Sequence, residues 1–169
     1  MMVSVVRGAV LVVALAMPSS VLSQTAIEWS RYTDPEVGFS VDLPLGLFEP
    51  LNTEVPGGLT LAELGGSGQL SIYSGPATGL TLDEFAARLS AGEQVRSITY
   101  QVGGNSWFVL SGFYGAEGQG VEPLIFYSKV LMSPDHETFA AFEISYDEDD
   151  KARFDPIVDR IEASFQRPR

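Results

Sequence analysis

Residues 124–146, LIFYSKVLMSPDHETFAAFEISY, contain two apolar runs separated by a polar turn. This pattern indicates a β-hairpin. In the first strand, Phe126 and Val130 point to one side, because successive side chains in a strand alternate between faces. Ile125 and Leu131 point to the other side. Both faces are therefore apolar, and the hairpin predicts a sheet that is covered on both sides.

Shorter strand patterns precede this hairpin. Four segments read as two further hairpins joined by glycine-rich turns: 59–64 with 69–73, and 97–102 with 107–110. Residues 39–43 alternate apolar and polar side chains and end at Pro44, as a half-buried strand does. The sum is about seven strands, and hairpin connections make the sheet largely antiparallel.

Two amphipathic helices complete the pattern. Thr81 followed three residues later by Glu84 forms a capping box, and apolar residues at helical spacing predict a helix over 82–91. A second helix is expected to end the chain, with Asp155 as its cap and Pro156 in its first turn. Both helices must bury an apolar stripe against the sheet. The predicted fold class is α+β, as an α/β/α sandwich.

The N-terminus has the pattern of a secretory signal peptide. Residues 1–23 carry one early base, Arg7, then an apolar run and a stretch of small residues. We expect the signal to be removed, which leaves a single globular domain over 24–169 that is periplasmic or extracellular. The apolar run is shorter than the ~20 residues that cross a bilayer, so no membrane span is expected after cleavage. A retained N-terminal anchor is the alternative.

Charge and composition exclude several classes of protein. The net charge is −12, and removal of Arg7 leaves 9 bases against 22 acids, or −13. Such a surface repels phosphate backbones, so nucleic acid is not an expected partner. The chain has no cysteine, which excludes disulfides, thiolate metal sites and a cysteine nucleophile.

Several short segments resemble the PsbP-like domain. Residues 38–44, Gly-Phe-Ser-Val-Asp-Leu-Pro, are similar to the opening strand of that group. Residues 81–85 are placed like the start of its first helix, and 163–165, Ala-Ser-Phe, are similar to its closing helix. The tryptophan that often follows the opening strand in that group is replaced here by Leu47. The resemblance implies a PsbP-like fold and a non-catalytic accessory or binding domain, and it carries over no metal or cofactor site.

Catalysis by a Ser-His-Asp triad would require His136, the only histidine. This residue lies in the turn of the 124–146 hairpin, where we expect an exposed side chain. The nearest serines in the pattern, Ser111 and Ser128, lie within predicted strands and lack the glycine-flanked elbow of serine hydrolases. We therefore assign no catalytic residue to a triad.

Acidic residues offer two other candidates. The run Asp147–Asp150 lacks the spacing of a calcium-binding EF-hand loop, and we interpret it as a solvated loop before a helix, with a weak cation site as the alternative. Glu63 and Glu143 lie inside predicted strands. Glu143 faces away from Phe142, so its pKa should rise if its side of the sheet is covered. An acid at the sheet rim, or one paired with an arginine, is the simpler interpretation.

The segment 112–120 is rich in glycine but lacks the Gly-Lys-Ser/Thr of a phosphate-binding loop. We predict a long hairpin loop in which Phe113 and Tyr114 offer aromatic surface to a partner, while Trp107 belongs to the core. The sequence thus favours an exported, non-enzymatic accessory or binding domain that contacts another protein or an envelope component, without cofactor or metal. The alternatives are a carboxylate-based hydrolase that uses Glu143, and a small-molecule carrier with a pocket between helix and sheet.

Overall fold

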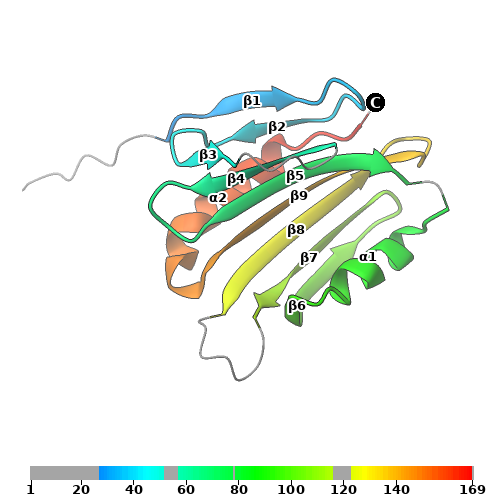
Figure 1. Cartoon of the computed structure of the whole chain (residues 1–169). Coiled ribbons are helices and arrows are strands. Elements are labelled where there is room, and N and C mark those ends of the chain that lie inside the picture. Colours follow the sequence, from blue (N-terminus) through cyan, green and yellow to red (C-terminus); the bar gives the residue numbers. More distant parts are fainter. Residues whose placement is uncertain (1–26, 52–56, 78, 116–122, 169) are drawn as a thin grey trace, which may run out of the picture.

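The predicted 124–146 hairpin forms the centre of a seven-stranded antiparallel sheet of order β3-β4-β5-β9-β8-β7-β6 (Figure 1). The computed structural model describes residues 27–51, 57–77, 79–115 and 123–168, so the predicted signal peptide, 1–23, lies outside the described residues. The strands of the sheet are β3 (Phe48–Pro50), β4 (Gly58–Glu63), β5 (Gln69–Pro76), β6 (Val95–Gly103), β7 (Trp107–Tyr114), β8 (Leu124–Met132) and β9 (Thr138–Asp147).

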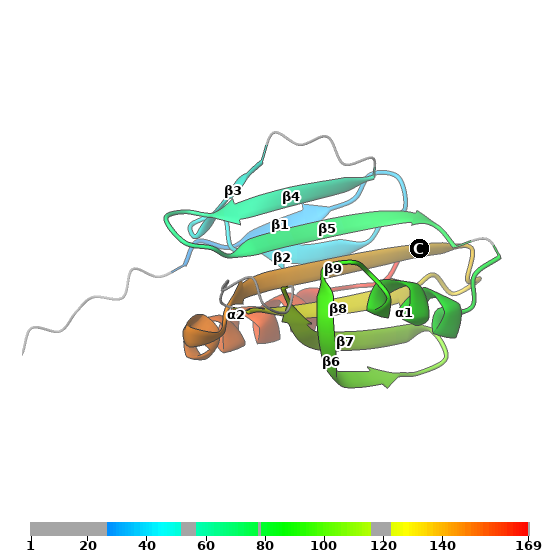
Figure 2. The ribbon, with the colours of Figure 1, turned by 60° about the horizontal axis from the view of Figure 1, so that its bottom comes forward.

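A helix lies on each face of the sheet, and we name the faces after them (Figure 2). The α2 face is covered by α2 (Lys151–Ser164) together with a two-stranded ribbon of β1 (Ser30–Thr33) and β2 (Ser40–Leu43). Phe142 of β9 and Phe154 of α2, both fully buried, belong to the large core on this side. Side chains of β8 alternate as predicted: Ile125 packs in this core, whereas Phe126 packs on the other face of the sheet.

The α1 face carries a second, smaller core. Helix α1 (Leu82–Ser90) begins with the predicted capping box, in which the Glu84 N–H donates to the Thr81 hydroxyl and the Thr81 N–H donates to the Glu84 carboxylate. Its Phe85 packs edge-on against Phe108 and Phe139 of the sheet. With only nine residues, α1 is too short to cover the whole face.

The sheet edges are short or irregular. Strand β3 pairs with β4 over only three residues. At the other edge, the pairing of β6 with β7 shifts register twice, between Val95 and Ser97 and between Ile98 and Tyr100. Such bulges twist an edge strand and interrupt its regular row of hydrogen-bonding groups.

The predicted fold class is confirmed, but two details of the prediction were wrong. Residues 39–43 do form a strand, yet it belongs to the β1–β2 ribbon and not to the main sheet. Helix α2 begins at Lys151, not after Asp155, so Pro156 lies inside it. The earlier start buries Phe154, whose ring stacks on Tyr146 with ring centroids 4.4 Å apart. Pro156 is the sixth residue of α2, so the helix lacks the hydrogen bond that an N–H at this position would donate to the Ala152 carbonyl.

Glu63 shows how this fold accommodates a buried carboxylate. Its side chain in β4 is 4% exposed and forms an ion pair with Arg153 of α2. It also accepts the N–H of Gly68 at 3.0 Å. The arginine-paired interpretation therefore holds for Glu63, and this contact joins the β4–β5 hairpin to α2.

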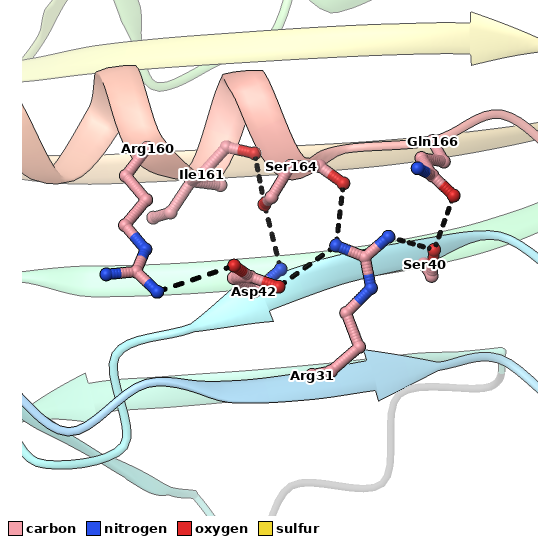
Figure 3. A network of polar contacts seen from close by, with 7 residues as sticks. All are labelled: Arg31, Ser40, Asp42, Arg160, Ile161, Ser164 and Gln166. Atoms are coloured by element: carbon pink, nitrogen blue, oxygen red, sulfur yellow. Dashed lines mark hydrogen bonds and ion pairs between the residues drawn. The ribbon is translucent and has the colours of Figure 1, made fainter.

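A polar network fastens the β1–β2 ribbon to the end of α2 (Figure 3). Arg31 donates to Asp42 at 2.9 Å, to the Ser164 carbonyl at 3.1 Å and to the Ser40 hydroxyl at 2.7 Å. The Asp42 N–H donates to the Ser164 hydroxyl at 2.9 Å, and Arg160 lies 3.6 Å from the Asp42 carboxylate. The ribbon is thus held by hydrogen bonds as well as by apolar packing.

We expect Ser164→Ala to lower the free energy of unfolding by about 0.5–1.5 kcal/mol, because the Asp42 N–H loses its acceptor. Urea denaturation measures this loss. Ser90→Ala is the matched control, since Ser90 also ends a helix and donates to a carbonyl of its own helix, and its described hydrogen bond stays within that helix. Equal effects of the two substitutions would show that the tie to the ribbon contributes nothing.

Candidate functional site

A groove of about 390 Å³ opens on the α1 face, at the end of the sheet near Gly115. We call it the Glu143 groove. Its lining residues come from β5, the α1–β6 connection, β7, β8 and β9: Gln69, Glu93, Gln94, Tyr114, Gly115, Leu124, Glu143 and Ser145.

Strand alternation places the carboxylate of Glu143 in this groove. Phe142 and Ile144 point into the core of the α2 face, so Glu143 between them points to the opposite side, as the sequence predicted. In register, Glu143 lies opposite Ser71 of β5 and Ser128 of β8. Small polar neighbours on both sides leave room above the carboxylate.

Tyr114 holds the carboxylate from one side. Its hydroxyl donates to Oε1 of Glu143 at 2.7 Å, and its ring stacks on Phe126 with ring centroids 4.3 Å apart. Among the described side chains, which do not include that of Arg96, no donor reaches the second oxygen of Glu143, and no lysine or arginine lines the groove. The carboxylate is therefore oriented, while half of its acceptor capacity stays open.

Burial dominates the electrostatics of this site. Burial raises the pKa of Glu143, and the hydrogen bond from Tyr114 offsets part of the rise. Burial and the nearby charge of Glu143 raise the pKa of Tyr73 to about 12, and they raise the pKa of Tyr114 as well. The hydroxyl of Ser128, 1% exposed, lies near that of Tyr73 and lowers the pKa of Tyr73 in part.

The raised pKa predicts how stability responds to pH. The folded state holds the Glu143 proton more tightly than the unfolded state does. Glu143 therefore lowers stability as the pH rises above 4.5, the ordinary pKa of a glutamate side chain. We therefore expect Glu143→Gln to become progressively more stable than the wild type as pH rises, until the folded-state pKa is passed. Urea denaturation across a pH series measures this difference.

Glu84→Gln is the control of opposite sign. The N–H and the hydroxyl of Thr81 lower the pKa of Glu84, so its charged form stabilises the folded state. This contribution is present above the ordinary pKa and is lost on acidification. The glutamine variant should then be less stable than the wild type at neutral pH and equal to it in acid. A Glu143→Gln curve parallel to the wild type would contradict the burial argument.

The aromatic pair predicted to contact a partner lies at the end of β7 and not in a loop, so that placement was wrong. Phe113 and Tyr114 point to opposite faces: Phe113 packs against the α2-face core, while Tyr114 lines the groove. Both are half-buried. Their role in partner binding stays a prediction. The remainder of the expected loop, 116–122, lies outside the described residues.

The other sequence candidates do not meet in one site. His136 is exposed in the β8–β9 turn with φ 61°, and Ser111 in β7 donates to the carbonyl of Phe126 at 2.8 Å. In the acidic run, Asp147 accepts from the Ser67 hydroxyl and Asp150 pairs with Arg153. Within the ranges that the structure describes, no three acids or histidines are arranged to hold a metal ion.

Trp107 is half-buried and packs against the α2-face core, in agreement with its predicted place. Sequence reasoning missed Tyr73, which lies two residues from the register partner of Glu143 on β5. Its alternation with the buried Ile72 was a usable signal, but the β5–β9 pairing that brings it to Glu143 is long-range.

The two alternative functions also have places in the structure. Glu93 is the second carboxylate that lines the Glu143 groove, as a hydrolase would need, but it is exposed. A separate hollow of about 320 Å³ between α1 and the β6–β7 turn would be the place for a carrier's ligand, and its lining includes Asp83, Gln101 and Asn105.

Helices of the described segments are all too short or too polar to span a membrane.

Comparison with known proteins yields similarity in structure only. No protein-family model matches the sequence, and no curated protein matches it. The solution structure of cyanobacterial PsbP (CyanoP) from Synechocystis sp. PCC 6803 is similar with a TM-score of 0.62 and 16% identity, over 89% of this chain and 98% of that one. The Ran-binding protein Mog1p from Saccharomyces cerevisiae is similar with a TM-score of 0.61 and 9% identity, over 83% and 96%. The chain therefore has a PsbP-like fold.

Proposed function

We propose that this chain is an exported, non-catalytic binding domain that holds another protein or an envelope component at the Glu143 groove. The observation that carries the proposal is the groove itself. It combines the exposed part of Tyr114 and the side chain of Leu124 with a carboxylate that has no cation among the described residues. Aromatic and apolar surface beside an oriented polar group is typical of a recognition site.

The comparisons support this proposal at the level of fold. Mog1p, which shares the fold at 9% identity, is described as a Ran-binding protein. A protein-binding role is thus compatible with this architecture, although function depends on the site and not on the fold. Export is proposed from the sequence pattern of residues 1–23.

Site-specific photo-crosslinking tests the binding function. A photoreactive residue at Gln69, which lines the groove, should give a discrete crosslinked product in cells of the native host. The same residue at Glu137, exposed in the β8–β9 turn, should not. Tyr114→Ser should weaken the Gln69 product about tenfold by removing the aromatic anchor. Identical products from both positions, or none from Gln69, would contradict the proposal.

Export is tested separately. Cell fractionation should place the chain outside the cytosol, and mass spectrometry of the purified protein should find Gln24 at its N-terminus. A cytosolic protein that retains residues 1–23 would show that export is wrong, whatever the groove binds.

A further inference from the structure

We propose that the Glu143 groove receives a lysine side chain of the partner protein, with the ammonium group against the free oxygen of Glu143. This inference rests on the proposed binding function and specifies its chemistry. It starts from a comparison of two sites within the same sheet.

The α2 face contains a completed version of the same arrangement. Glu162 of α2 accepts the Tyr127 hydroxyl on one oxygen and the Lys129 ammonium on the other, both at 2.7 Å. On the α1 face, Glu143 accepts the Tyr114 hydroxyl at the same distance, and its other oxygen has no donor among the described residues. Within the part of the chain that the structure describes, a tyrosine binds the carboxylate at both sites, and an ammonium group completes only the Glu162 site.

The buried Glu63 is also paired with a cation from within the chain, in this case an arginine. Its carboxylate is paired with Arg153. Burying a carboxylate is unfavourable unless it is paired. Glu63 follows this rule, whereas no described cationic side chain pairs with Glu143. A cation from outside would give Glu143 the partner that Glu63 and Glu162 have within the chain.

The surroundings of Glu143 suit an ammonium group in particular. An ammonium has three N–H donors. The free oxygen of Glu143 supplies one acceptor; the Ser128 hydroxyl lies on the same face, directly across from Glu143 in register, but it is buried near Tyr73 and does not line the groove. Such cross-strand neighbours have Cβ atoms about 4.5–5.5 Å apart. Lysine is chosen over arginine because Glu162, the tyrosine-bound counterpart of Glu143, takes an ammonium group on its other oxygen.

Long-range electrostatics act in the same direction. The chain carries a net charge of −12, and a second acid, Glu93, lines the groove. A cleft lined by charge of one sign concentrates ligands of the opposite sign. Cationic side chains are therefore attracted, and anionic ones are repelled.

NMR titration with a capped lysine, N-acetyl-lysine N-methylamide, tests the inference at neutral pH. We expect saturable shifts of the backbone amides of Gln69, Tyr114 and Ser145, and none with the uncharged norleucine analogue. Glu143→Gln should weaken binding about tenfold or more. Glu137→Gln removes the same charge from the exposed β8–β9 turn and should leave binding within about twofold.

Each contrary result has a defined meaning. Equal weakening by both glutamine variants would overturn the site in favour of general charge attraction. Equal or tighter binding of the capped arginine would overturn the choice of lysine. If Gln69 crosslinks a partner equally well in the Glu143→Gln background, the binding function stands and the lysine inference fails. If capped lysine binds but Gln69 crosslinks nothing, the proposed binding function fails.

Discussion

Replacing Phe142 with alanine is expected to lower the free energy of unfolding by about 3–5 kcal/mol. The ring has no solvent exposure and lies in β9, the central strand of the sheet. It stacks on Tyr127 with centroids 5.9 Å apart and meets the edge of Phe165 at 5.2 Å. Because Phe165 closes α2, the cavity would loosen the sheet and the helix together.

Urea denaturation of the purified domain measures this loss. Phe142→Leu is the control, since leucine keeps most of the apolar volume, and it should lower stability by about 1.5 kcal/mol or less. A loss below about 1 kcal/mol for the alanine variant would show that the core collapses around the missing ring and does not depend on it.

Gly112→Ala should be the most disruptive change of a single methyl group in the sheet. A Cβ at this position would lie 1.9 Å from the Ser97 carbonyl oxygen and 3.0 Å from the Ile98 Cα. Both atoms belong to the backbone of β6, so relief requires β6 to move away from β7 at its bulges. We expect a loss of about 1–3 kcal/mol, with faster amide hydrogen exchange concentrated in β6.

Gly75→Ala provides the matched control. Gly75 is also in a strand, but its added Cβ would meet only the ring of Phe139, at 3.2 Å, and a side chain can tilt away. Its stability should stay within about 1 kcal/mol of the wild type. Equal effects at the two glycines would mean that close backbone approach at the bulge is unimportant.

Local periodicity predicted much of the fold. The two-residue period of residues 124–146 identified a strand pair covered on both faces. The same period predicted that Glu143 and Phe142 point to opposite faces of the sheet. The capping box at Thr81 correctly predicted that α1 starts at Leu82. These features depend on neighbours in the chain, which is why sequence alone suffices for them.

Features that depend on distant contacts could not be predicted. The start of α2 moves to Lys151 because Phe154 packs on Phe48 and Tyr146, which belong to other elements. Likewise, Tyr114 of β7 and Glu143 of β9 meet across β8, which lies between their strands in the sheet. Their contact depends on this strand order. Sequence reasoning identified Glu143 as a candidate, but it could not show which hydroxyls surround the carboxylate.

The irregular edges of the sheet affect how copies of the protein can pack against one another at high concentration. A long, flat edge strand is a template on which copies of a protein stack into fibrils. Here one edge ends in the three-residue β3 and the other is interrupted twice along β6. Neither edge of the described sheet offers a long, unbroken backbone ladder to a neighbour, which disfavours edge-to-edge stacking of folded copies.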